Sequence, residues 1–238
     1  MHLLFAARIP KRGEPEETCE DRFAVAGEPV LCAAVSDGAS SGIFAGEWAQ
    51  ILAEGFVRHA MTGEAELPSL DPFREEWQRQ TGSTLLPWYM QAKRTEGAAA
   101  ALVGVTFDNA KMRWSVVAVG DCCLFQWRDG VLLTAFPVQR PGDFDSTPPL
   151  LHTDPTRSGE HLIRQDTGTY ADGDEFLLMS DALAAWFLNE IERGRDPMVW
   201  LAKLATAKDF SDRITTLRDS NRLRNDDVAL IHLRAETT

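Results

Sequence analysis

Acidic residues stand beside several apolar runs of this 238-residue sequence, where strands are expected to meet loops. Asp37, Asp121 and Asp181 each follow such a run, and Asp226 precedes one. Carboxylates gathered at one edge of a sheet repel one another strongly unless cations lie between them. Oxygen ligands, with no metal-type spacing of cysteine or histidine, suit hard ions such as Mg²⁺ or Mn²⁺. Two such ions could lower the pKa of a shared water and clamp an in-line displacement at phosphorus.

Strands are expected to position these acids, at residues 31–35, 114–119, 175–179 and 228–233. The first runs straight into Asp37, and a carboxylate at the end of a buried strand is costly unless a cation or hydrogen bonds compensate it. In an antiparallel sheet, acids that precede one strand lie at the same edge as acids that follow its neighbours. Glu20 and Asp21 precede another short strand, and a hairpin would bring them close to Asp37.

Helices are expected to alternate with these strands. An apolar stripe after Gly42 predicts an amphipathic helix facing a core, through Ala45, Trp48, Ile51, Leu52 and Phe56. Further helical segments are expected from Asp71 to about Arg94, after Asp181, from Asp196 and over residues 211–222. The pattern favours a single α+β domain over residues 1–238.

The remaining segments of the chain are predicted from turn residues and composition. Residues 97–136 show strand runs separated by turns at Asp108-Asn109 and Asp129-Gly130, which predicts hairpins. Residues 136–160 are rich in Pro, Gly, Asp and Thr, and we expect a long loop with little regular structure there. A short strand is expected at residues 161–165, followed by a turn at 167–173.

The composition indicates which binding partners and which cellular compartment are expected. The net charge of -12 argues against a nucleic-acid or anionic-membrane surface. No apolar run approaches the roughly 20 residues of a membrane helix, and no signal peptide is evident. None of the four cysteines forms a C-x-x-C pair, which is typical of a protein in the reducing cytoplasm. We expect a cytoplasmic monomer.

Five motifs in order resemble a known family. CEDRF, VSDGASSG with AGEWA after it, VVAVGDC, EFLLMSDA and NDDVALIHL are similar to motifs of the metal-dependent serine/threonine protein phosphatases of type 2C, the PPM family. The resemblance covers nearly the whole chain and is closest to divergent bacterial members. It implies a four-layer α-β-β-α sandwich with two central antiparallel sheets. It also implies two Mn²⁺ or Mg²⁺ ions at one edge.

The resemblance implies roles for the first group of acids. Asp37 would bridge both metals, and the carbonyl of Gly38 would bind one of them. Glu20 would reach one metal through or beside water, and Asp21 would support the site. On this reading Asp37 would be catalytic.

The later acids complete the implied set. Asp181 and Asp226 would hold the other metal and share the catalytic role with Asp37. Asp121 resembles the acid that, together with Asp181, binds a third and weaker metal in bacterial relatives. Asp227 is the less suited ligand of the neighbouring pair.

The sequence departs from the family where the substrate phosphate is bound. The arginine usually found four residues before the first acid is Glu16 here. Arg8, Arg12 and Arg22 are the candidates to replace it, and we predict Arg12 because it belongs to the same loop. The histidine that is the general acid in some relatives corresponds to Ala39.

The resemblance and the acids together predict a phosphoprotein phosphatase dependent on Mn²⁺ or Mg²⁺. A metal-bridging water would attack phosphoserine or phosphothreonine directly, and a Ser/Thr kinase would be the opposing partner. The alternative is a pseudophosphatase, a sensing or scaffolding module that keeps the fold without efficient turnover. A third hypothesis is a metal hydrolase with a non-protein phosphoester substrate, chosen by residues 136–160.

Overall fold

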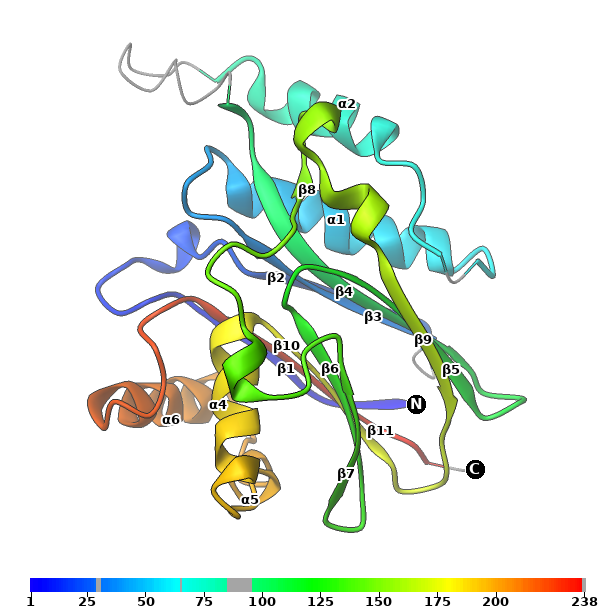
Figure 1. Cartoon of the computed structure of the whole chain (residues 1–238), viewed down its shortest axis with the longest axis vertical. Helices are drawn as coiled ribbons and strands as arrows, with labels where there is room; N and C mark the ends of the chain where they lie inside the picture. The colour runs from blue at the N-terminus through cyan, green and yellow to red at the C-terminus, as the bar shows by residue number, and fades with distance from the viewer. Residues whose placement is uncertain (29–30, 65, 85–95, 237–238) are drawn as a thin grey trace.

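Two antiparallel sheets lie face to face in the computed structural model, which describes residues 1–28, 31–64, 66–84 and 96–236 (Figure 1). Within those residues, one sheet has five strands in the order β1-β11-β10-β6-β7, and the other has six, in the order β2-β3-β4-β5-β9 with β8 paired to β4. The strands are β1 (His2–Ile9), β2 (Arg22–Ala26), β3 (Cys32–Gly38), β4 (Ala99–Asp108), β5 (Arg113–Val119), β6 (Cys123–Arg128), β7 (Val131–Phe136), β8 (Leu151–His152), β9 (Arg164–Thr169), β10 (Glu175–Met179) and β11 (Val228–Arg234).

Helices cover the outer face of each sheet. Figure 1 shows α1 (Ala45–Ala60) and α2 (Asp71–Thr81) beyond the sheet that contains β3. On the opposite side of the molecule, the five-stranded sheet carries α4 (Asp181–Glu192), α5 (Met198–Leu201) and α6 (Ala207–Asp219). The expected four-layer α-β-β-α sandwich is therefore confirmed.

Three apolar clusters correspond to the three interfaces between these layers. Residues of both sheets, such as Val35, Val103 and Ile231, form the cluster between the sheets. Trp48 and Phe56 of α1 belong to a second cluster, on the outer side of the six-stranded sheet. The third cluster joins the five-stranded sheet to α4, α5 and α6. The apolar stripe predicted after Gly42 is therefore a core-facing stripe.

The alternation of side chains along β3 directs Asp37 toward the space between the sheets. Ala33 and Val35 belong to the inter-sheet cluster, whereas Cys32 and Ala34 face α1. Because side chains alternate along a strand, Asp37 is on the same face as Val35. In the other sheet, Met179 pairs with both Leu230 and Cys123. This register brings the start of α4, the entry to β11 and the turn before β6 to one end of that sheet.

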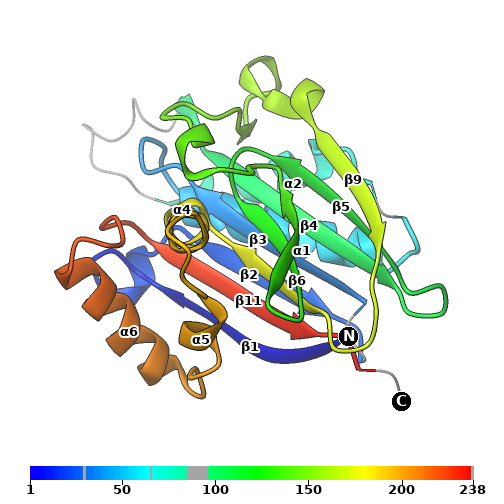
Figure 2. The ribbon, with the colours of Figure 1, turned by 60° about the horizontal axis from the view of Figure 1, so that its bottom comes forward.

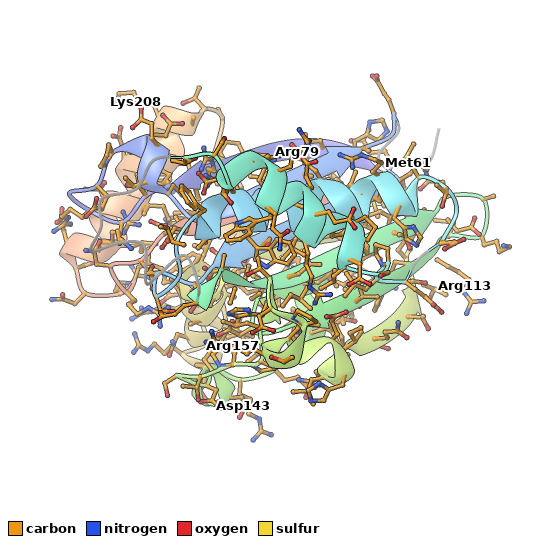
Figure 3. All side chains as sticks on the ribbon, turned by 90° about the horizontal axis from the view of Figure 1, so that it is seen from above. Met61, Arg79, Arg113, Asp143, Arg157 and Lys208 are labelled. Carbon is orange, nitrogen blue, oxygen red and sulfur yellow. The ribbon has the colours of Figure 1, made fainter. Side chains whose placement is uncertain are left out.

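The segment after β7 is more ordered than expected. Within residues 136–160 the structure has β8 and 3₁₀ helices at Pro141–Asp143 and Pro155–Arg157, and a further one spans Gly159–Leu162. Figure 3, which labels Asp143 and Arg157, shows this segment at the edge of the molecule. The buried Arg74 of α2 donates to the carbonyl of His152 at 3.3 Å and pairs with Glu160.

Several element boundaries differ from the expectation. The strand predicted at 161–165 is only partly right, because residues 161 and 162 belong to a 3₁₀ helix and β9 begins at Arg164. β9 extends to Thr169 and so replaces part of the turn expected at 167–173. The helix expected from Asp196 is the single turn α5, and α6 begins at Ala207 rather than at residue 211. The helical region expected from Asp71 to about Arg94 begins with α2, which ends at Thr81, and its part over residues 85–95 lies outside the described residues. Across the part of the chain that is described, no helix combines the length and apolarity needed to span a bilayer.

Candidate metal centre

Asp37 is the second-last residue of β3, at a point where the backbone is tightly confined. Ser36, one residue earlier, donates its hydroxyl to the carbonyl of Ala101 at 2.7 Å. A Cβ atom at Gly38 would lie 2.8 Å from the backbone of Ala45 and 3.0 Å from the carbonyl oxygen of Glu20. Only glycine fits this gap, so Gly38 allows the start of α1 and the Glu20 loop to approach the end of β3.

Asp21 lies beside Asp37 and is fully buried, with 0% of its surface exposed. Neither of its carboxylate oxygens has a partner with full hydrogen-bond geometry among the described residues, although the side chains of Ser180 and Asp37 lie close enough to interact with it. Burial, followed by repulsion from Asp227 and Asp181, raises the pKa of Asp21 to about 8. Burial, followed by repulsion from Asp21 and Asp181, also raises the pKa of Asp37 well above its usual value. A buried carboxyl group of this kind is neutralised either by a proton or by a cation.

Asp121 extends this group from the turn before β6. It is 6% exposed, and burial followed by repulsion from Asp181 raises its pKa to about 7. Asp181 is the first residue of α4 and interacts electrostatically with Asp21, Asp37 and Asp121. Asp21, Asp37, Asp121 and Asp181, together called the carboxylate cluster below, therefore come from four separate segments of the chain.

Asp226 lies at the outer side of the carboxylate cluster, next to an arginine that the sequence did not single out. The guanidinium of Arg224 pairs with Asp181 and lies 3.0 Å from Asp226 Oδ2. One oxygen of each of these two acids is thus held by the same cation. The only sequence signal was a basic residue two positions before Asp226, inside an acidic segment.

Asp227 has a different task from its neighbour. Its two carboxylate oxygens accept hydrogen bonds from the backbone N–H groups of Lys11 at 2.7 Å and Glu20 at 2.6 Å. The Glu20 carboxylate accepts a hydrogen bond from the hydroxyl of Ser40, and burial raises its pKa. Asp227 therefore positions the Glu20 loop.

The arginines expected near the phosphate are engaged elsewhere. Arg12 pairs with Asp219 on α6. Arg22 donates to the carbonyls of Cys19 and Asp21, and Arg8 lies 3.4 Å from the same two carbonyl oxygens. The phosphate-binding role of Arg12 stays a prediction.

The donors suit a hard divalent cation. Among the described residues, no three acids, histidines or cysteines are placed so that they could hold a metal ion as they stand. Arg224 provides a reason, because it holds Asp181 and Asp226 on its own guanidinium. The chemistry nevertheless fits, since the orphaned oxygens of Asp21 and the raised pKa values of three neighbouring carboxylates are relieved by positive charge.

Solved structures share this fold. A bacterial serine phosphatase matches at a TM-score of 0.63 with 14% identity, covering 100% of this chain and 99% of that one. The Mycobacterium tuberculosis serine/threonine phosphatase PstP matches at 0.59 with 18% identity, covering 99% and 100%. Its catalytic domain in complex with two manganese ions matches at 0.57 with 17% identity, covering 97% of each chain. At these identities the likeness shows the fold alone.

The comparison of sequences gives the family. Curated proteins provide no match. The family described as protein phosphatase 2C matches residues 12–229, a range that contains every member of the carboxylate cluster together with Glu20 and Asp226. The match extends over most of the chain, and the chain therefore belongs to the protein phosphatase 2C family and is a phosphatase enzyme.

Proposed function

We propose that this chain is a phosphoprotein phosphatase that depends on Mn²⁺ or Mg²⁺ and hydrolyses phosphoserine and phosphothreonine. The observation that carries the proposal is the buried Asp21, whose unpartnered carboxylate lies among Asp37 and Asp181. This arrangement is unfavourable without a cation. The two manganese ions of the PstP catalytic domain support the choice of metal.

The proposed ligands are those implied by the resemblance to the protein phosphatase 2C family. Asp37 and the carbonyl of Gly38 would hold one ion, with Glu20 and Asp21 beside it. Asp37, Asp181 and Asp226 would hold the other, and Asp121 with Asp181 would hold a third. When bound, such ions supply a water of lowered pKa and charge stabilisation for displacement at phosphorus.

The cysteines support water as the nucleophile. All four are buried, and burial raises the pKa of Cys19 to about 12 and that of Cys32 to about 11. Burial also raises the pKa values of Cys122 and Cys123, which follow Asp121 directly. A cysteine attacks as the thiolate, so these protonated thiols are poor nucleophiles. Direct attack by water, without a covalent phosphoenzyme, is therefore proposed.

The proposed setting follows from the same features. A phosphorylated protein would be the substrate, and a Ser/Thr kinase would act in the opposite direction. The free cysteines support a reducing compartment such as the cytoplasm. Residues 1–238 are proposed to act as one domain and as a monomer.

The competing proposal is a pseudophosphatase that binds partners without efficient turnover. The ion pairs of Arg224 with Asp181 and Asp226 favour it, because they occupy two proposed metal ligands. Glu16, which stands where an arginine was expected, also favours it.

Hydrolysis of p-nitrophenyl phosphate and of a phosphothreonine peptide separates the two. We expect turnover with Mn²⁺, none with EDTA, and a loss of at least 100-fold in Asp37→Asn. Glu75→Gln is the matched control, because Glu75 is exposed on α2 and loses the same charge. Mn²⁺ binding by calorimetry without turnover in the wild type would favour the pseudophosphatase.

A further inference from the structure

Arg224 combines contact with the proposed metal ligands and access to solvent. Its guanidinium pairs with Asp181 and Asp226, and 59% of its side chain is exposed. It lies in the connection between α6 and β11, which also supplies Asp226 and Asp227. An arginine in this position faces the solution from which a phosphorylated substrate would arrive.

Other nearby arginines are tied to the protein itself. Arg8 and Arg22 are directed to backbone carbonyls of Cys19 and Asp21. The buried Arg218 donates to the carbonyls of Pro10 and Asp226, and so fixes two loops. Their donors serve the fold, and moving them would leave backbone groups without partners.

Two more positively charged side chains, Arg12 and Lys11, lie in the loop that follows β1. Arg12 pairs with Asp219, on α6 and outside the carboxylate cluster. The ammonium of Lys11 lies 3.2 Å from the hydroxyl of Ser40 and 3.9 Å from Glu20 Oε2. Lys11 is a point charge, whereas a guanidinium presents a planar fork that matches two phosphate oxygens.

We propose that Arg224 binds the phosphate group of the substrate. This inference rests on the proposed phosphatase function. Asp181 and Asp226 hold the guanidinium in the structure, and they are also proposed metal ligands. Once a metal ion neutralises these two acids, they attract the guanidinium less, and its donors become available to phosphate oxygens. The same residue is thus a counter-ion of the metal-free site and an anion ligand of the loaded one.

If Arg224 had only an electrostatic role, its removal would have a different effect on Mn²⁺ and phosphate binding. If Arg224 only balanced the charge of Asp181 and Asp226, its removal would tighten Mn²⁺ binding and leave phosphate binding unchanged. Binding of inorganic phosphate to the Mn²⁺-saturated protein distinguishes the two roles. It is measured by calorimetry and as competitive inhibition of p-nitrophenyl phosphate hydrolysis, and Mn²⁺ affinity is measured separately without phosphate.

The variants are Arg224→Ala, Arg224→Lys, Arg12→Ala and the control Arg113→Ala. Arg113 is exposed at the start of β5, the end of that strand away from Asp121, and is labelled in Figure 3. For Arg224→Ala we expect phosphate affinity to fall at least tenfold, with a matching rise in KM and a smaller change in kcat. Arg224→Lys should recover part of the affinity, and the control Arg113→Ala should remain within twofold of the wild type. Arg12→Ala tests the competing candidate for the phosphate and should lose less affinity than Arg224→Ala.

The outcomes separate this inference from the function on which it rests. Wild-type turnover together with unchanged phosphate binding in Arg224→Ala would overturn the inference alone. A tenfold loss of phosphate affinity in Arg12→Ala, with none in Arg224→Ala, would also overturn it in favour of Arg12. Absence of Mn²⁺ binding and turnover in the wild type would overturn the proposed function and the inference with it.

Discussion

The carboxylate of Asp227 accepts a hydrogen bond from the backbone N–H of Glu20 at 2.6 Å, across 207 positions of sequence. Its other oxygen accepts from the N–H of Lys11 at 2.7 Å. One side chain at the entry to β11 therefore holds both ends of the loop that follows β1. The loop in turn presents Glu20 and Asp21 to Asp37.

Replacing Asp227 should loosen this loop. In Asp227→Ala two backbone donors lose their acceptor, and we expect the free energy of unfolding to fall by about 1–3 kcal/mol. Mn²⁺ binding should weaken as well, because Glu20 is no longer held. Asp227→Asn keeps one acceptor oxygen and should lose less. Urea unfolding in EDTA and calorimetry with Mn²⁺ measure the two effects, and equal stability of the alanine variant and the wild type would contradict the positioning role.

Asp21 should lower the stability of the metal-free protein and strengthen metal binding. In the metal-free protein its buried carboxylate is repelled by neighbouring acids, so Asp21→Asn should raise the free energy of unfolding by on the order of 1 kcal/mol in EDTA. The same change should lower the affinity for Mn²⁺. Thermal unfolding with EDTA and with saturating Mn²⁺ provides the comparison. A variant less stable than the wild type in EDTA would show that the carboxylate is compensated by other means.

Gly38 should not tolerate a side chain. A Cβ atom there meets backbone atoms of Ala45 at 2.8 Å, so either α1 or β3 must shift. We expect Gly38→Ala to destabilise the protein by about 1–3 kcal/mol and to reduce turnover. Gly142→Ala is the control, since nothing lies within 4 Å of a Cβ atom at that position. Equal melting temperatures for the two variants would be inconsistent with the close approach at Gly38.

Asp174 should make stability depend on acid pH. Burial acts to raise its pKa, but hydrogen bonds from Arg128, Gln126 and the N–H of Ala171 outweigh burial and lower it. A lowered folded-state pKa stabilises the protein above the unfolded value of about 3.9, and this contribution is lost as pH falls through the folded pKa.

The matching variant is Asp174→Asn. We expect a loss of about 1–3 kcal/mol at pH 7, where the charged hydrogen bonds are present. The difference from the wild type should shrink below pH 4, as the wild-type carboxyl gains a proton. Urea titrations at pH 7, 5 and 3.5 in EDTA test this, and a difference that does not change with pH would rule out the proposed linkage.

Patterns within one element could be read from the sequence, and contacts between distant elements could not. The stripe of Trp48, Leu52 and Phe56 is visible because one helix face is buried. β9 reads RQDTGT and is mostly exposed at a sheet edge, so no apolar alternation marks it. The start of α6 is marked by a local signal, the capping box between Thr206 and Asp209, which places the helix N-terminus at Ala207 rather than at residue 211.

The candidate site also has a part that the sequence predicts and a part that it does not. The placement of Asp37 and Asp181 follows from where apolar strands end, and the structure brings them together with Asp21 and Asp121. The partners of Arg224 and Asp227 depend on how the connection before β11 folds over the other loops. A pattern within one segment holds no information about such pairs. They emerge only from tertiary structure.

The interior position of β11 in its sheet bears on the order of assembly during synthesis. This strand lies between β1 and β10, and Figure 2 shows the blue β1 beside the red β11. While the chain emerges from the ribosome, β1 must wait for residues 228–234 before its ladder can form. Pairing across so many residues is slow because a long loop must close first. The acids near Glu20 therefore gain their final neighbours late, and a nascent chain would carry them without the finished carboxylate cluster.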